Sequence, residues 1–315
     1  VVSVGKKLMG EFKSSAESDG KNLHSLWSLP GLPLTERFGV YDSNDQLSFD
    51  QELCICLDSG HVQLATHIDS SILYSQSNYT FKTGESNQAR SGVDFFISFL
   101  ESLTCGRFFN SIVDVGGNDS YLAKALKSKA VNTSVVDPVC ASKDGQTIEG
   151  VKIFGRFVEN VDFSTEMESP DLLVCRHTLE HIVNPRQVIN QWFQQCHEDC
   201  LYVVEVPCLE GLVRSMRFDA IFHQHIHYFD LGSIQRLIWD CGGEFLGYRY
   251  NHQGSCGGAL LVAFRRAKSK QNKPFCELGP KIAWLESRIK LYEIQMSVMR
   301  ELFHELNGPV YGFGA

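Results

Sequence analysis

This 315-residue sequence lacks long apolar runs and clusters of basic residues. No run approaches the roughly 18–20 apolar residues that a membrane-spanning helix needs, and the opening segment VVSVGKKLMGEFKSSAESDG lacks the apolar core of a signal peptide. With 37 Asp and Glu against 29 Lys and Arg, the net charge is −8, so a nucleic-acid backbone would be repelled over most of the surface. We therefore expect a cytoplasmic protein that binds neither membranes nor nucleic acids.

The cysteines lack the spacing of a disulfide framework or of a zinc site. There are eleven, an odd number, and several fall in apolar runs, as expected for free thiols in a reducing compartment. The one close group, LCICLDSGHVQL, contains Cys54, Cys56, Ser59 and His61, but no second close pair stands upstream to complete four zinc ligands. We interpret this group as a strand with two buried thiols.

Composition divides the chain into three parts. Residues 1–80 are irregular and predict a small accessory domain. Residues 81–268 alternate between short apolar strands and amphipathic helices, which is typical of a mostly parallel α/β sheet. Residues 269–315 contain a polar linker, a predicted helix at about 278–306 that we expect to pack on the rest of the protein, and the strand-like end GPVYGFGA. Seven strands are expected in the middle part: SIVDVGG, TSVVDP, VKIFGRF, DLLVCRH, CLYVVEVP, EFLGYRY and GALLVAFRR, the last two as an antiparallel pair.

The first chemical signal is the stretch SIVDVGGNDSYLAKALKSK. Its apolar strand ends near Asp114, Gly116 and Gly117 follow, and Asn118 and Asp119 open a helix. Glycines at this place let the backbone approach a ligand at the carboxyl end of a strand, beside a helix N-terminus. Because the third glycine of a dinucleotide fingerprint is missing, binding of a pyrophosphate is disfavoured.

Two further segments are expected at the same edge of the sheet. About 20 residues on, the next strand ends in Asp137 and Pro138, which places a carboxylate to accept hydrogen bonds from two ribose hydroxyls. The strand DLLVCRH ends in His177, and Glu180 and His181 follow it directly. These segments together predict a nucleoside-binding site.

The stretch FDAIFHQHIHYFD places His223, His225 and His227 on alternating positions. On a strand, such side chains share one face about 6–7 Å apart, which three zinc-bound nitrogens could span only with difficulty. The histidines could hold a metal, form a buried face without chemistry, or carry out acid/base work near neutral pH. Because no clear partner ligand is present and the segment follows the strand YVVEVP, we favour acid/base work and expect no metal.

Together the motifs resemble those of class I S-adenosylmethionine-dependent methyltransferases, and most closely the sugar C-methyltransferases. EVPCLEGLVRSMRFDAIFHQHIHYFD is similar to that family's EVP strand followed by FDxIYHEHxxYF. GLPLTERF with CLDSGHVQL resembles its N-terminal zinc domain, NDSYLAKAL its cofactor turn, GSCGGALLVAF its late strand, and VYGFGA the opening of its C-terminal Rossmann-like domain. The resemblance implies a Rossmann-like α/β fold, S-adenosylmethionine as methyl donor with S-adenosylhomocysteine as product, and a nucleotide-linked keto-sugar as substrate.

The resemblance also implies roles for single residues. The glycine turn would hold the methionine part of the cofactor, and Asp137 its ribose. His225 would be the general base that removes a proton from the carbon beside the ketone. His181, with His223 or Gln224, would hold the oxyanion that forms. The oligomeric state is not predicted.

Some positions depart from the family pattern. Phe222 and Gln224 replace a tyrosine and a glutamate, Cys56 and Ser59 stand where a C-x-x-C would be, and the C-terminal domain is cut off at Ala315. The loss of a hydroxyl and a carboxylate favours an alternative in which the same fold methylates oxygen or nitrogen of another small metabolite. A second alternative is a binding protein that keeps the fold without turnover.

Overall fold

The computed structural model describes residues 9–12, 22–34, 48–69, 82–269 and 277–306, with Leu73, Asn272 and Gly308. Apart from Gly308, the expected C-terminal strand in GPVYGFGA lies outside these residues, as does the segment SSAESDG. The strands are β1 (Met9–Glu11), β2 (Leu23–Pro33), β3 (Ser48–Cys56), β4 (Val62–Leu64), β5 (Thr66–Ile68), β6 (Phe109–Val115), β7 (Ala130–Val136), β8 (Thr147–Ile148), β9 (Val151–Phe154), β10 (Leu172–Arg176), β11 (Leu201–Pro207), β12 (His227–Tyr228), β13 (Gly243–Asn251) and β14 (Ala259–Arg266). The α-helices are α3 (Asn87–Thr104), α4 (Tyr121–Leu126), α5 (Pro185–Gln195), α6 (Leu209–Arg214), α7 (Leu231–Asp240) and α8 (Leu278–Glu305).

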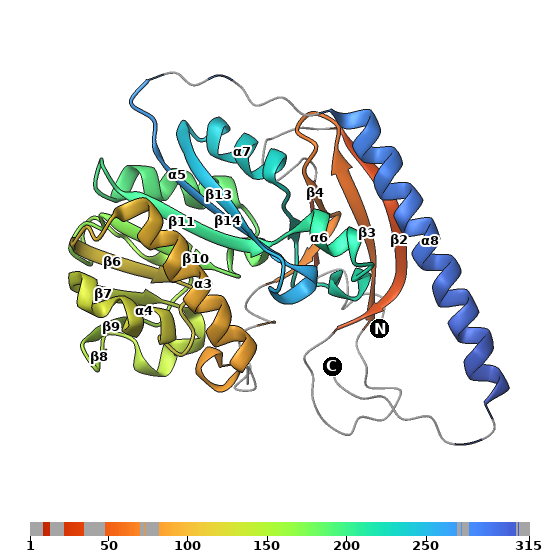
Figure 1. Cartoon of the computed structure of the whole chain (residues 1–315), viewed down its shortest axis with the longest axis horizontal. Helices are drawn as coiled ribbons and strands as arrows, with labels where there is room; N and C mark the ends of the chain where they lie inside the picture. Colours follow the sequence, from red (N-terminus) through yellow and green to blue (C-terminus); the bar gives the residue numbers. More distant parts are fainter. Residues whose placement is uncertain are drawn as a thin grey trace.

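The central sheet has eight strands in the order β13-β14-β11-β10-β6-β7-β9-β8 (Figure 1). All seven expected strands are present, and β13 and β14 form the expected antiparallel pair. The expected number of seven was wrong because β8 forms a short hairpin with β9, turning through Glu149 and Gly150 at φ of 50° and 80°. A strand of two residues is too short to show the alternation by which a strand is recognised in a sequence.

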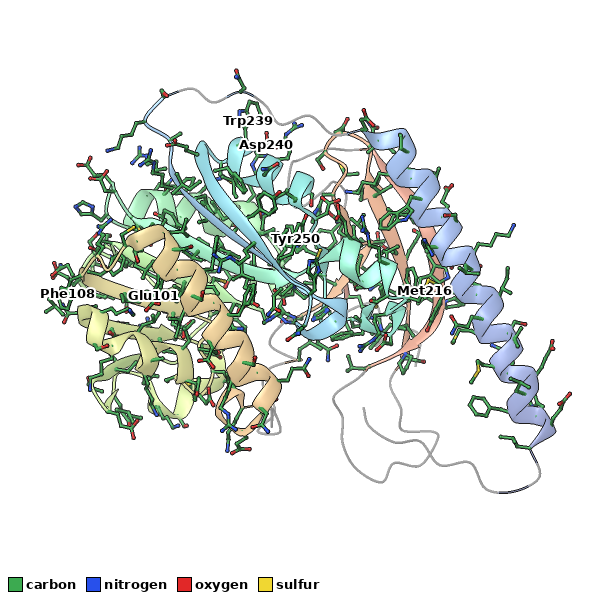
Figure 2. All side chains as sticks on the ribbon, viewed as in Figure 1. Glu101, Phe108, Met216, Trp239, Asp240 and Tyr250 are labelled. Atoms are coloured by element: carbon green, nitrogen blue, oxygen red, sulfur yellow. The ribbon has the colours of Figure 1, made fainter. Side chains whose placement is uncertain are left out.

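Helices cover both faces of this sheet, as its alternating side chains require. On one face, Ile112 and Leu172 pack against apolar residues of α3 and α4. On the other face, Val113 and Leu173 pack against α5 and α7, where Trp192 is fully buried. Glu101 and Phe108 lie on the left in Figure 2, on the side of the central sheet that faces away from the N-terminal part. The carboxyl ends of the parallel strands point the other way, toward the N-terminal part of the chain.

The N-terminal part forms a second sheet in the order β12-β4-β3-β2. Its strand β12 comes from the histidine segment and pairs antiparallel with β4. The segment is therefore not one strand: Phe218–Ala220 is a 3₁₀ turn, and only His227–Tyr228 is extended and paired. This pairing fixes the histidine segment between the two sheets.

Helix α8 lies along β2 and continues past it (Figure 1). The helix was expected at about 278–306 and to pack on the rest of the protein, and the structure bears this out. It buries Leu285 and Ile289 in a cluster that also includes Met216, which lies next to α8 in Figure 2. Lys281 forms a buried ion pair with Asp230. No helix in the described part of the chain combines the length and apolarity needed to span a membrane.

Candidate active site

A cavity of about 710 Å³ opens at the carboxyl ends of β6, β7, β10 and β11. This volume lies within the range of small-molecule sites, and the edge of an open α/β sheet is where such sites form. The cavity brings together ten of the twelve residues predicted for the site. They are Asp114, Gly116, Gly117, Asn118, Asp137, Pro138, His177, His181, Gln224 and His225.

The other two predicted residues, Asp119 and His223, are engaged elsewhere. The Asp119 carboxylate accepts hydrogen bonds from the backbone N–H groups of Gly84 and Tyr121, at 2.8 and 3.3 Å. It thereby ties the segment before α3 to the start of α4. His223 donates from Nε2 to the carbonyl of Leu32, at 2.9 Å, and so contacts the N-terminal sheet. Neither side chain is part of the cavity wall.

Glycine is required at both positions of the turn after β6. Gly116 has φ +74°, and a Cβ there would lie 1.8 Å from Oγ1 of Thr178. A Cβ at Gly117 would lie 2.8 Å from Oδ2 of Asp114. The backbone therefore runs close to both side chains and leaves a cradle open to the cavity.

Asp137 holds this cradle in shape. One of its carboxylate oxygens accepts from the N–H of Asn118 at 2.9 Å, and the other accepts from the N–H of Val139 at 2.8 Å. Burial raises the pKa of Asp137, and these two hydrogen bonds oppose the rise. Each oxygen keeps a second lone pair, so the carboxylate can still accept from a ligand hydroxyl.

Asp114 is buried beside the cradle, and its Oδ2 has no hydrogen-bond partner. Burial raises the pKa of Asp114, Arg176 opposes the rise and the nearby carboxylate of Asp137 adds to it, so that the pKa is about 7. A buried acceptor without a partner is costly unless a ligand donates to it. The oxygen is therefore suited to a cationic or donor group of a bound molecule.

A network of charges joins β10 to β11 at the floor of the cavity. Arg176 is ion-paired with Glu205 and lies 5.4 Å above the ring of Phe96. His177 has its ring nitrogens 3.6 Å from Glu180 and 3.7 Å from Glu205. Burial acts to lower the pKa of His177, but the two carboxylates raise it above its ordinary value. The guanidinium is thus committed to Glu205.

Hydrogen bonds to backbone carbonyls fix the tautomers of the two histidines that line the cavity. Nδ1 of His181 lies 2.7 Å from the carbonyl of Gln224, and Nδ1 of His225 lies 3.2 Å from that of Ala220. A carbonyl only accepts, so in the neutral rings Nδ1 carries the proton and Nε2 the lone pair. Burial, and then the neighbouring His181, lower the pKa of His225 to about 3. The His225 imidazole is therefore neutral at physiological pH.

His227 points away from this pair. Its Nε2 donates to the carbonyl of Ile182 at 3.0 Å, so its Nδ1 accepts from Nε2 of His61 at 2.9 Å. Burial lowers the pKa of His227 to about 4 and also lowers that of His61. The three alternating histidines thus lie in two places: His223 and His227 contact the N-terminal part, and His225 lines the cavity.

Within the part of the chain that the structure describes, one group of three side chains comes close enough to share a cation. It consists of Glu180, His181 and His225, whose ligand atoms lie within 4.8 Å of one another. The cysteine-containing strand β3 forms no such group among the described residues, and no disulfide links its Cys54. That the protein binds no metal stays a prediction.

Several residues of the cavity wall have no signal in the sequence. Asn87 and Gln88 come from the first turn of α3, while Asn251 ends β13 and Gln253 and Cys256 follow in the loop before β14. These segments are separated by more than 150 residues in the chain and meet only in the fold. The repeated Gly residues of GSCGGALLVAF marked the loop without showing that it faces the cavity.

The chain matches the model of a family described as a methyltransferase domain, over residues 85–245, which is more than half of its length. The chain belongs to this family. The expected class I methyltransferase fold, the assignment to the S-adenosylmethionine-dependent methyltransferases and the expected cofactor are thereby confirmed.

A curated relative is the C-methyltransferase NovU of Streptomyces niveus, 26% identical over 235 residues. The match covers 71% of this chain and 53% of the relative, so the chain spans about half the length of that protein. Two solved structures with bound S-adenosylhomocysteine are similar. The N-methyltransferase NodS of Bradyrhizobium japonicum has a TM-score of 0.45 and 11% identity, covering 61% of this chain and 93% of that one. The magnesium protoporphyrin IX methyltransferase of Synechocystis has a TM-score of 0.48 and 12% identity, covering 63% and 100%.

Proposed function

We propose that the protein transfers a methyl group from S-adenosylmethionine to the carbon beside the ketone of a nucleotide-linked keto-sugar. The observation that carries the proposal is that His225, with its lone pair on Nε2, and the glycine cradle line one cavity. The similarity to a C-methyltransferase supports the choice of carbon as the methylated atom.

The residues at the cradle fit S-adenosylmethionine. The unpartnered Oδ2 of Asp114 suits the ammonium group of its methionine part, and the second lone pairs of Asp137 suit its ribose hydroxyls. When bound, S-adenosylmethionine supplies an electrophilic methyl group on a sulfonium. The chain's own part is to hold it against Gly116 and Gly117, where a side chain would collide with Thr178 or Asp114 and displace the backbone.

His225 is the proposed proton acceptor. The C–H bond beside the ketone breaks, the proton goes to Nε2 of His225, and the electron pair stays on the substrate as an enolate. A neutral imidazole in the cavity wall, with its lone pair on Nε2, can accept this proton without first losing one. His181 and Gln224 lie beside it and are the proposed contacts of the substrate oxygen.

The charge of the cavity limits which part of a nucleotide-linked sugar can enter it. Five carboxylates line the cavity, and its one guanidinium, on Arg176, is paired with Glu205. No lysine side chain is among the described residues of the wall. We therefore place the sugar inside the cavity and its phosphates outside, because carboxylates repel phosphates.

A second candidate function is methylation of oxygen or nitrogen in another small metabolite. The low pKa of His225, about 3, makes its imidazole a weak base, which suits an acceptor atom that needs little help to lose a proton. The replacements at Phe222 and Gln224 point in the same direction.

Solvent exchange separates the two candidates. The protein, saturated with S-adenosylhomocysteine in deuterium oxide, is incubated with thymidine diphosphate-linked 4-keto-6-deoxyglucose, and deuterium beside the ketone is followed by NMR. We expect exchange well above that of a sample without protein. If S-adenosylhomocysteine binds in calorimetry but neither exchange nor carbon methylation occurs with keto-sugars, carbon methylation is wrong. If it does not bind at high micromolar concentration, both candidate functions fail.

A further inference from the structure

Three hydrogen-bond acceptors converge on one side of the cavity. They belong to Glu180, His181 and His225, of which one ligand atom each lies within 4.8 Å of the other two, and each neutral ring keeps its lone pair on Nε2. Acceptors placed this close together repel each other through their lone pairs unless a positive charge or a donor lies between them. The arrangement is therefore suited to a state in which a positive charge is present.

Glu180 is the member of this group whose buried carboxylate accepts no hydrogen bond. It is 1% exposed, and neither of its oxygens has a hydrogen-bond partner. The nearest nitrogens are Nδ1 of His177 at 3.6 Å and Nε2 of His181 at 3.9 Å, both beyond hydrogen-bond distance. A buried carboxylate in this state is costly, so its retention in the wall of the cavity calls for a role.

A carboxylate at this place can stabilise the protonated form of His225. Accepting the substrate proton turns its buried imidazole into a cation, which both its burial and the adjacent His181 oppose. Gln224, next to it in the sequence, is neutral and cannot stabilise that cation by charge. Glu180 favours the protonated form of His225, since opposite charges attract across this distance without a hydrogen bond.

We propose that Glu180 is the positioning residue of the proton transfer: its carboxylate stabilises the imidazolium that forms at His225. This rests on the proposed function and adds a residue to it. The C–H bond of the substrate breaks, an N–H bond forms at Nε2 of His225, and Glu180 stays ionised throughout. After methyl transfer the proton returns to solvent from His225, which restores the neutral ring.

The other charged and titratable groups around Glu180 do not replace it. His177 lies between Glu180 and Glu205, but Glu205 is paired with Arg176. Cys256 faces Glu180 from the loop before β14, and burial raises the pKa of its thiol to about 11, so it carries no charge at neutral pH. Among the described residues, Glu180 is thus the carboxylate that lies next to the imidazole pair, beside its ion pair with His177.

The test first removes the carboxylate at position 180 and then places a carboxylate at position 224. Glu180→Gln removes the charge and keeps the shape of the side chain. We expect kcat for methyl transfer to thymidine diphosphate-linked 4-keto-6-deoxyglucose to fall about 100-fold, while KM and the affinity for S-adenosylhomocysteine stay within about threefold. Adding Gln224→Glu to this variant should recover at least about tenfold, because the new carboxylate also lies beside His225. Glu180→Asp should keep most of the activity.

The control is Glu198→Gln, which changes the net charge equally at an exposed position just before β11 and should leave every value unchanged.

Full activity of Glu180→Gln, or no recovery by Gln224→Glu in a variant that still binds S-adenosylhomocysteine, overturns the inference alone. If Glu180→Gln fails to fold, a charge-conserving Glu180→Asp that is as inactive as His225→Asn overturns it. One equivalent of metal in the purified wild type also overturns it, since a bound cation would then balance the three acceptors. A wild type that neither exchanges nor methylates keto-sugars overturns the proposed function and this inference together.

Discussion

At the cofactor end of the cavity, both carboxylate oxygens of Asp137 accept hydrogen bonds from backbone N–H groups, whereas at the histidine end neither oxygen of Glu180 accepts a hydrogen bond. The first end is held rigid by its own backbone before any ligand arrives. The second end keeps at Glu180 a buried carboxylate that accepts no hydrogen bond, and the partner we propose for it is a charge that exists only during the reaction. One end is built for a fixed shape and the other for a change of charge.

This difference follows from how each end is assembled. The cofactor end is built by two neighbouring strands, β6 and β7, and the turns that directly follow them. The histidine end combines the 3₁₀ turn Leu179–His181 with the segment before β12, and β12 is held by the N-terminal sheet. The first can form whenever the central sheet forms. The second also requires the two sheets to be packed together.

The largest effect is expected at the histidine end. His225→Asn removes the proposed proton acceptor, so turnover should fall by about 10²–10⁴-fold in a methyl-transfer assay. The affinity for S-adenosylhomocysteine, measured by calorimetry, should stay within about twofold, because the ring contacts the substrate and not the cradle. An equal loss of cofactor affinity would show that the two ends do not act separately.

The next largest effect is expected at the cofactor end. Asp137→Ala should weaken binding of S-adenosylhomocysteine by roughly 1–3 kcal/mol, since ribose hydroxyls and the N–H groups of Asn118 and Val139 lose their acceptor together. Turnover at saturating cofactor should change far less than in His225→Asn. Calorimetry and steady-state kinetics on the same preparation measure both. A fall in kcat larger than the fall in affinity would contradict the division into two ends.

The cofactor end could be predicted from the sequence and much of the histidine end could not. Gly116, Gly117 and Asp137 stand in contiguous motifs, where a strand, a turn and a helix start follow one another and fix the position of the side chains. His223 and His225 are two residues apart, yet one contacts the N-terminal sheet and the other lines the cavity. Their directions depend on the 3₁₀ turn and on pairing with β4, which alternation alone does not reveal.

Asp119 shows the same limit at the cofactor end. Its place after the two glycines made it a predicted cofactor ligand, but its carboxylate accepts from the backbone of Gly84, about 35 residues earlier in the chain. A side chain next to a predicted turn can serve the ligand or the neighbouring backbone, and spacing does not distinguish the two. Whether Asp119 contacts the ligand or the backbone depends on how distant segments of the chain pack together.

A smaller effect concerns the pH dependence of cofactor binding. Because burial raises the pKa of Asp114 to about 7, this carboxyl is protonated below pH 7 in the protein without ligand. A cationic methionine group needs the ionised form, so the affinity for S-adenosylhomocysteine should fall by up to about tenfold per unit below pH 7. Calorimetry at pH 8, 7 and 6 measures this, and Asp114→Asn should bind more weakly and lose the dependence.

The stability of the protein without ligand should change with pH in the opposite direction to the cofactor affinity. Since the folded protein holds the Asp114 proton between the ordinary pKa of 3.8 and about 7, stability without ligand should decrease as the pH rises through this range. Asp114→Asn should remove that decrease in urea unfolding. A cofactor affinity that does not change from pH 8 to pH 6 in the wild type would contradict the assignment of Asp114 to the methionine group.

The smallest effect on turnover is expected at His223, which the sequence placed among the catalytic residues. Its Nε2 donates to the carbonyl of Leu32, and its ring lies edge-on to Phe49 at 5.7 Å, both in the N-terminal sheet. His223→Asn should therefore lower the free energy of unfolding by about 1 kcal/mol and change kcat by less than about threefold. Urea unfolding and the methyl-transfer assay measure the two effects, with His225→Asn as the reference. A loss of turnover as large as that of His225→Asn would show that His223 takes part in catalysis, although its side chain does not line the cavity.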